Sequence, residues 1–397
     1  MSSFDPDPND RITLFGEEFV VQMHPNAPDM AYAQEGGRAT IFKLSDHNGR
    51  HHALKVFKPK FIDPDQSAVA GRLARYCTLP GMRAAHRRVV REHNGPPRSS
   101  LDHAVIMPWI EGTTWFDILN RAKARGDYLQ VDAAIHLCRR FLEVLRSLEA
   151  CGIAHTDISA GNVVIDLVSL DVQLVDLEEL FGPGFPPPAT LTGRTSGYAR
   201  DTFSKTDFWS GVGDRFAGAV LAAEMLALSA PRLASTCHGD SFFDATTIGA
   251  PDSPHYRSVV DYLRGLIPDF AALFARTWSA PDLARCATIA ECASCIDAIA
   301  ARTPSPVSDV IVAARPGAHD EDREARLAET VRWVNLFDAE PIPAPPTPTS
   351  PLPPPVPNVP GTGPRRRDRP RMTASFYAVL VVVLCAIMIA GIAAASH

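Results

Sequence analysis

Apolar and polar residues alternate over the first hundred residues, in short runs that are separated by turn-forming sequences. Alternate side chains of a strand face opposite sides of a sheet, so this two-residue period predicts β-strands. Asp46-His47-Asn48-Gly49 is turn-forming and predicts a hairpin between the runs that flank it. A short helix is expected at residues 63–76, where Asp63-Pro64 supplies an N-cap and a first-turn proline. The predicted strands are residues 19–23, 39–44, 52–57, 89–90 and 104–109.

After Gly112 the apolar period changes to that of a helix. Residues 131–150 carry apolar side chains at helical spacing and are expected to form a largely buried helix. A strand-rich part followed by a helix-rich part predicts an α+β fold with two lobes, and the cleft between them is the expected ligand site. The further predicted helices are residues 214–227, 256–266, 270–278 and 289–302.

The C-terminal region is different, because residues 372–396 contain no charged side chain. About twenty mostly apolar residues can cross ~30 Å of hydrocarbon, so a single transmembrane helix is predicted at residues 374–395. A buried core helix is the alternative. A basic flank at residues 365–371 predicts that the large N-terminal part lies in the cytoplasm. Its arginines are Arg365, Arg366, Arg367, Arg369 and Arg371.

Composition divides the rest of the chain. The expected parts are a disordered N-terminus at residues 1–10, a globular domain at 11–302 with lobes at 11–110 and 111–302, and a proline-rich linker at 303–371. Within the linker, residues 320–337 have the pattern of a short amphipathic helix, and the prolines after them predict an extended spacer. Docking of an SH3-like partner on these prolines is the alternative.

Charge and cysteine content exclude some classes of protein. A formal net charge of -6 gives no general reason to expect a nucleic-acid partner. Eight scattered cysteines fit a reducing compartment better than a disulfide framework. Cys292 and Cys295 form a C-x-x-C pair, but no second pair lies at zinc-site distance, so helix packing is favoured over a metal or redox role. The N-terminus lacks the pattern of a signal peptide.

The stretch HTDISAGNVVID, residues 155–166, carries the clearest candidate chemistry. Asp157 and Asn162 precede a short apolar strand, and a second apolar run ends at Asp176. Two strands that present an Asp, an Asn and an Asp can hold Mg²⁺ beside a base for a hydroxyl group. This is the arrangement that phosphoryl transfer requires.

With Lys55 upstream and Asp214 downstream, these residues resemble, over residues 12–302, the eukaryotic-like (Hanks-type) protein kinase family. The chain is similar to a divergent, bacterial-type, membrane-anchored member. The resemblance implies a two-lobed protein kinase-like fold, with ATP and Mg²⁺ as cofactors. It also implies that Asp157 orients the substrate hydroxyl and that Asn162 and Asp176 bind the metal.

Further positions match the nucleotide-binding motifs of the family. Lys55, in Ala-Leu-Lys-Val-Phe, is implied to bind the ATP phosphates; a solvent-facing strand lysine is the alternative. Met107 is implied to be the gatekeeper, with the Pro108 carbonyl and the Ile110 amide on adenine. Gln34 and Ala39 stand where the family has its first and third loop glycines. The implied glycine-rich-loop residues over the phosphates are Gly36, Gly37, Ala39 and Ile41.

Several positions depart from the family pattern. Thr156 replaces the arginine that receives an activation-loop phosphate, and Ser159 replaces a lysine, as in RIO-type kinases. Asp176-Leu177-Glu178 stands in place of Asp-Phe-Gly. No acidic residue lies between Asp65 and Glu92, where the family has the glutamate partner of its lysine. Asp65 or a neighbouring polar residue substitutes, or the lysine is held differently, or the protein is a pseudokinase.

Three residues are implied to support the site. Asp214 would accept hydrogen bonds from the backbone of the catalytic loop; a plain helix N-cap is the alternative. Asp201 would replace the glutamate that ends the activation segment, with Arg285 as its partner. A separate basic stretch is expected to be a solvated face, with a docking surface for acidic substrates or lipid headgroups as the alternative. Its members are Arg83, Arg87, Arg88 and Arg91.

The predicted function is that of a membrane-tethered, cytoplasmic serine/threonine-protein kinase that uses ATP and Mg²⁺ to phosphorylate a protein substrate. A pseudokinase that acts as a membrane-proximal scaffold or nucleotide sensor is the first alternative. A small-molecule kinase of the aminoglycoside or lipopolysaccharide type is the second.

Overall fold

The computed structural model describes residues 4–62, 65–91, 101–188, 195–238, 241–304 and 310–312. All of them lie in the first of two compact units, Met1–Pro343. The second unit, Ala344–His397, lies outside the described residues.

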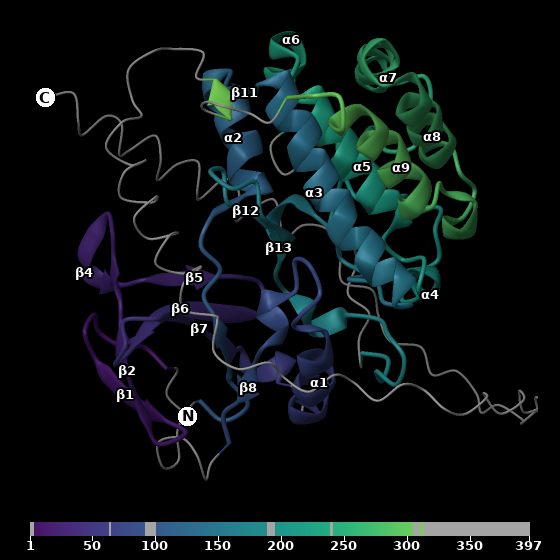
Figure 1. The fold of residues 1–397 in the computed structure, drawn as a ribbon. Helices are drawn as coiled ribbons and strands as arrows, with labels where there is room; N and C mark the ends of the chain where they lie inside the picture. The colour runs from purple at the N-terminus through teal and green to yellow at the C-terminus, as the bar shows by residue number, and fades with distance from the viewer. Residues whose placement is uncertain are drawn as a thin grey trace, which may run out of the picture. The chain divides into compact units, whose positions relative to one another are not determined.

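A curled antiparallel sheet of seven strands forms the N-terminal part (Figure 1). Its path runs in the order β1 (Arg11–Leu14), β2 (Glu17–Val21), β6 (Ala39–Asp46), β7 (His51–Phe57), β9 (Val105–Pro108) and β8 (Arg88–Val89), with β5 (Ala33–Glu35) beside β6. The predicted β6–β7 hairpin is confirmed: Gly49 has a φ of 75°, and its amide donates to the Asp46 carbonyl. A smaller hairpin joins β3 (Met23–His24) to β4 (Ala27–Ala31).

The chain between β7 and β9 is hydrogen-bonded to the second part of the domain. The predicted helix is α1 (Gln66–Leu73), which continues as the 3₁₀ turn η2 (Ala74–Tyr76). Another 3₁₀ turn, η3 (Arg83–Ala85), follows Gly81, whose carbonyl accepts a 2.8 Å hydrogen bond from the Leu174 amide. This bond joins the loop after α1 to strand β13, described below.

Helices form the second part, and they pack around α5 (Arg215–Ala227), which is buried from Phe216 to its end. Helix α3 (Val131–Ala150) has the predicted bounds. Helix α2 (Trp115–Arg125) was not predicted from the apolar period; Thr114 caps it by accepting from the Asp117 amide. The remaining helices are α4 (Lys205–Phe208), α6 (Pro231–Ala234), α7 (Pro254–Leu266), α8 (Pro268–Trp278) and α9 (Ile289–Ala300).

Two small sheets accompany the helices (Figure 1). One joins β10 (Thr113–Thr114), β12 (Val163–Ile165) and β13 (Val172–Leu174), and it places the 3₁₀ turns η4 (Ala160–Asn162) and η5 (Leu177–Glu179) at its ends. The other pairs β11 (Tyr128–Leu129) with β14 (Ile311–Val312).

The predicted fold class needs a correction, because it combined a two-lobed kinase-like fold with a transmembrane helix. The structure supports an α+β fold with a curled antiparallel sheet, and within its described ranges no helix is long and apolar enough to cross a membrane. Helix α3 has 20 residues, but it is amphipathic and carries charged residues such as Arg139 and Glu143. The predicted span at 374–395, the basic flank, the amphipathic helix at 320–337 and the proline-rich spacer lie outside the described residues.

The expected disorder of residues 1–10 is wrong for the part of that segment that the structure describes. The Phe4 ring packs edge-on against Phe42 with a centroid distance of 5.1 Å. The Asn9 amide donates to the Val21 carbonyl, and the Val21 amide donates to the Asp10 carbonyl, both at 2.9 Å. Backbone pairing with β2 and an apolar anchor therefore order this segment.

Candidate functional site

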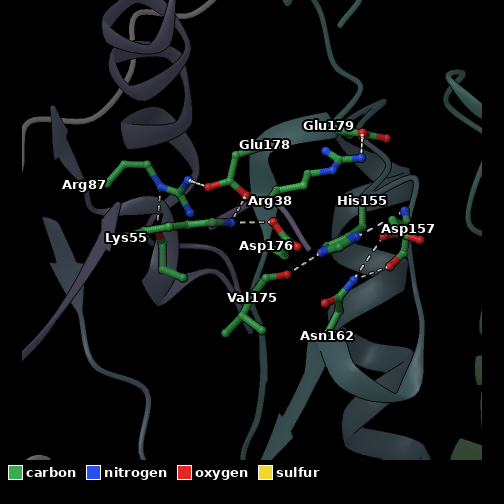
Figure 2. Close-up of polar contacts among 11 residues, drawn as sticks. Arg38, Lys55, Arg87, His155, Asp157, Asn162, Val175, Asp176, Glu178 and Glu179 are labelled. Atoms are coloured by element: carbon green, nitrogen blue, oxygen red, sulfur yellow. Dashed lines mark hydrogen bonds and ion pairs between the residues drawn. The ribbon is translucent and has the colours of Figure 1, made fainter. Parts of the chain in front are cut away.

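Asp157 and Asn162 lie together at the start of the small β10–β12–β13 sheet (Figure 2). The Asn162 side-chain amide donates to the Asp157 carbonyl at 2.8 Å and approaches the Asp157 carboxylate at 3.3 Å. His155 is fully buried, and its Nε2 lies 2.8 Å from the Val175 carbonyl, one residue before Asp176. The stretch singled out in the sequence is therefore one compact loop, held by its own side chains.

Asp214, at the start of α5, fixes the backbone of this loop. Its carboxylate accepts hydrogen bonds from the His155 amide at 2.6 Å and from the Thr156 amide at 2.7 Å. The predicted bonds are present, and the N-cap alternative is wrong because Asp214 makes no side-chain cap to α5. Two charge-assisted bonds to a buried carboxylate keep the loop in one conformation.

Lys55 lies on β7 between β6 and β9, with only 5% of the residue exposed. Its Nζ is 2.6 Å from Asp176 Oδ1 and 2.9 Å from Glu178 Oε2 (Figure 2). The alternative of a solvent-facing strand lysine is therefore wrong. The fold brings together Lys55 and Asp176, which are 121 residues apart in the chain.

Glu178 is the partner of Lys55 that the sequence analysis did not identify. It also accepts a 2.8 Å bond from Arg87 Nη1, and Arg87 Nε donates to the Ala84 carbonyl at 2.9 Å. Arg87 is buried, so the expectation of a solvated face is wrong for this arginine. The clue was the acidic residue two places after Asp176, where the family has glycine. The family has this partner on the helix after the lysine, but α1 carries no acidic residue.

The charges of this cluster shift one another's pKa values. Burial would lower the pKa of Lys55, but Glu178 and Asp176 outweigh it and raise that pKa. Burial would raise the pKa of Glu178, but Lys55 and Arg87 hold it well below its usual range. Burial and the neighbouring Glu178 carboxylate raise the pKa of Asp176 to about 6. Since 45% of the Asp176 side chain faces solvent, repulsion between the two carboxylates is the stronger reason.

The oxygen atoms of Asn162 and Asp176 fit the chemistry of Mg²⁺, which prefers carboxylate and carbonyl ligands. Their strands are adjacent: the Val175 amide donates to the Asn162 carbonyl at 3.0 Å. Asn162 directs its side-chain nitrogen toward Asp157, so its side-chain oxygen is the atom offered to a cation. In the part of the chain that the structure describes, no cluster of three or more His, Cys, Asp or Glu side chains could hold a metal. A cation here would thus be bound by Asn162 and Asp176, together with oxygen atoms of the bound substrate.

The predicted glycine-rich loop is the turn between β5 and β6. The Gly36 amide donates to the Ala39 carbonyl at 2.8 Å, and Ala39 is buried while Ile41 pairs in register with Lys55. Both glycines are exposed, and a Cβ on Gly37 would meet no atom within 4 Å. The tip therefore has room for a ligand to approach its backbone.

The contacts that Arg38 and Thr156 make with Glu179 were not predicted from the sequence. Arg38 Nη2 lies 2.5 Å from Glu179 Oε1, in the residue next to Glu178. Thr156, which has a left-handed φ of 69°, donates from its hydroxyl to the Glu179 carbonyl at 2.7 Å. The position that carries arginine in the family thus holds the turn η5 in this chain.

The predicted hinge follows β9. Met107 is buried and lies opposite Ala53. The Trp109 amide donates to the His51 carbonyl at 3.2 Å, so Pro108 occupies a non-hydrogen-bonded position and its carbonyl points away from β7. This direction leaves the carbonyl free of the β7 ladder, as the adenine-binding prediction requires, and Ile110 follows half-buried.

Comparison with known proteins adds nothing to this picture. A scan against protein-family models finds no match, and a search of curated proteins finds none either. The functional conclusion therefore rests on the geometry of the site.

The predicted Asp201–Arg285 pair is wrong. The Arg285 side chain is 75% exposed and lies 3.9 Å from Asp282, three residues before it, and Asp201 is exposed as well. Arg200, the neighbour of Asp201, instead donates to the Ala280 carbonyl. Arg285 is the last residue of the 3₁₀ turn η7 (Leu283–Arg285), which Asp282 caps, and its side chain faces solvent.

The segment at residues 195–201 is tied to the helical part by Tyr198, whose hydroxyl donates to Glu224 at 2.9 Å. Glu224 is fully buried on α5 and also accepts from Trp115 Nε1 and from the Phe242 amide. At the start of this segment, the Thr195 hydroxyl is 3.3 Å from Asp157 Oδ1. A hydroxyl group therefore already reaches the predicted base.

Proposed function

We propose that this protein is an ATP- and Mg²⁺-dependent protein kinase that phosphorylates serine or threonine hydroxyls. One observation carries the proposal: the buried Lys55 contacts Asp176, which follows strand β13, and β13 pairs with the strand that Asp157 and Asn162 precede. A cation for phosphate, two oxygen ligands for Mg²⁺ and a base for a hydroxyl are therefore held in one place.

Each of these residues has a definite part in the proposed reaction. The substrate hydroxyl oxygen forms a bond to the γ-phosphorus while the bond to the β–γ bridging oxygen breaks. The hydroxyl proton passes to the Asp157 carboxylate, and ADP leaves with the bridging electron pair. Lys55 would hold the phosphates, and Mg²⁺ on Asn162 and Asp176 would neutralise their negative charge. Positioning and charge neutralisation supply most of the rate enhancement in such sites.

A protein substrate is favoured over a small molecule by the segment beside Asp157. Thr195 contacts Asp157, and three residues later Tyr198 anchors the same segment on Glu224. A segment fixed at these two points beside the base offers a surface along which an extended peptide can lie.

The test is transfer of radiolabelled phosphate from ATP by the full chain, with and without Mg²⁺, to itself and to a generic protein substrate. Asp157→Asn and Asp176→Asn are expected to lower transfer by at least ~10³-fold, because they remove the base and a metal ligand. Asp166→Asn changes an acidic residue at the far end of β12 and is the matched control. If wild-type protein transfers no phosphate but gains thermal stability from Mg-ATP, the proposal fails and the nucleotide-sensor alternative replaces it.

A further inference from the structure

The two carboxylates that contact Lys55 differ in how firmly they are held. The Asp176 side chain is 45% exposed and has Lys55 as its cationic contact. The Glu178 side chain is only 11% exposed and pairs with two cations, Lys55 at 2.9 Å and Arg87 at 2.8 Å. Glu178 is therefore the firmly held partner, and Asp176 is the one that can exchange Lys55 for a metal ion.

Arg87 is itself fixed from several directions. Its side chain is 1% exposed, and its Nε donates to the Ala84 carbonyl in η3. Turn η3 is attached to β13, because the Leu174 amide donates to the Gly81 carbonyl and the Arg83 amide donates to the Gln173 side chain at 3.2 Å. Strand β13 also leads directly into Asp176 and Glu178. Strand β13 therefore positions the Glu178 carboxylate in two ways: it leads directly into Glu178, and through η3 it holds Arg87, which contacts Glu178.

Helix α1 itself supplies no acidic side chain to this arrangement. Its sequence, Gln-Ser-Ala-Val-Ala-Gly-Arg-Leu, contains no carboxylate that could reach Lys55. A buried ammonium without a counter-charge is costly, so some acidic residue must accompany Lys55 when Asp176 turns to a metal. Glu178 is already in contact and keeps its second cation in either state.

We propose that Glu178 is the positioning residue for Lys55 and that Arg87 holds Glu178, so that Lys55 stays oriented toward the nucleotide phosphates independently of α1. The destination of Lys55 rests on the proposed kinase function, whereas the chain Arg87–Glu178–Lys55 does not. The position of Lys55 is thereby set by the same segment that carries the metal ligand.

The first measurement needs no nucleotide. Lys55 is labelled with a small amine-reactive reagent over a range of pH, and the labelled fraction is read by mass spectrometry. Glu178→Gln removes a negative charge from the buried ammonium, so we expect the labelled fraction at pH 8 to rise by ~10-fold, which corresponds to a fall of about one pKa unit. Glu18→Gln, which removes one carboxylate from the exposed Arg11–Glu18 ion pair on β2, is the control and should leave the labelled fraction unchanged.

The second measurement is steady-state kinetics with Mg-ATP. Glu178→Gln is expected to raise KM for ATP and to lower kcat, because Lys55 is no longer held in one orientation. Arg87→Met should shift both constants in the same direction, and Arg87→Lys, which keeps the charge, should restore part of the loss. Asp65→Asn, at the start of α1, should leave both constants unchanged.

If Glu178→Gln does not fold, the double variant Arg87→Met with Glu178→Gln is used. It removes the Arg87–Glu178 ion pair as a whole, so that Arg87 is not left as an unpaired buried charge. It should raise Lys55 labelling as the single variant would. Equal labelling of Lys55 in the Glu178→Gln and Glu18→Gln variants would overturn the proposal. If labelling rises as expected while wild-type protein transfers no phosphate, the positioning role of Glu178 holds and the kinase function fails.

Discussion

Arg38 Nη2 and Glu179 Oε1 lie 2.5 Å apart, although 141 residues separate them in the chain. The pair ties the turn between β5 and β6 to the segment after Asp176. The proposed function would put the nucleotide phosphates beneath this turn, so we expect the pair to slow nucleotide release.

Arg38→Gln is expected to speed release of a bound nucleotide by ~2–5-fold, the effect of losing a partly exposed ion pair. Stopped-flow measurement with a fluorescent ADP analogue gives the rate. Lys58→Gln is the matched control, because Lys58 pairs with the exposed Glu35 beside the same turn. Equal release rates in the Arg38 variant and the wild type would show that this ion pair does not slow nucleotide release.

Glu224 should make the stability of the fold depend on pH. Burial raises its pKa to about 7, and the hydrogen bonds from Trp115, Phe242 and Tyr198 lower it only in part. Because the folded-state pKa lies above the ordinary value of 4.5, the folded protein binds more protons than the unfolded chain between the two values. The free energy of unfolding should therefore fall as pH rises from about 4.5 to about 7, by about 3 kcal/mol in total from this group.

Urea unfolding at several pH values measures this dependence, and Glu224→Gln should flatten it. Glu291→Gln is the control: the bond from Arg276 lowers the pKa of Glu291 to about 2, so its contribution is lost only as pH falls below the ordinary value. An unchanged slope in the Glu224 variant would show that another group titrates in this window.

Asp214→Asn should destabilise the loop that carries Asp157 and Asn162. The new amide group can accept only one of the two bonds from the His155 and Thr156 amides, and its own hydrogens face the other. We expect a loss of ~3 kcal/mol in the free energy of unfolding, typical of buried hydrogen bonds to a charged group. Asp207→Asn, in the surface cap of α4, should cost much less. Similar losses in the two variants would contradict a special role for Asp214.

Gly112→Ala tests the close approach between the predicted hinge and β12. Gly112 has a φ of +137°, and a Cβ there would lie 2.6 Å from the Ile165 carbonyl oxygen. Strain and displacement of β12 should cost about 2–3 kcal/mol in the free energy of unfolding. Gly37→Ala, at the open tip of the β5–β6 turn, should change stability by less than ~0.5 kcal/mol. Thermal unfolding distinguishes the two; equal melting temperatures would refute the close contact.

The local elements could be predicted because short stretches contain the information for them. The apolar period of α3 gives its bounds at both ends, and Asn48-Gly49 specifies the β6–β7 turn. Helix α2 was missed because its cap at Thr114 is a single residue and its apolar face is short. The predicted membrane helix lies outside the described residues and has no counterpart among the helices that the structure describes.

For the candidate site, too, one part could be predicted from the sequence and another part depends on the tertiary structure. Its candidate chemical groups, Lys55, Asp157, Asn162 and Asp176, could be listed from the sequence with the help of the family resemblance. Their partners could not, because an ion pair depends on which distant segments the fold places side by side. Glu178 reaches Lys55 across 123 residues and Arg87 across 91. Arg87 lies in a basic stretch that favours solvent, and only packing against Glu178 and the Ala84 carbonyl explains its burial. Local sequence specified the elements and the reactive groups, and the tertiary fold selected which charges neutralise one another.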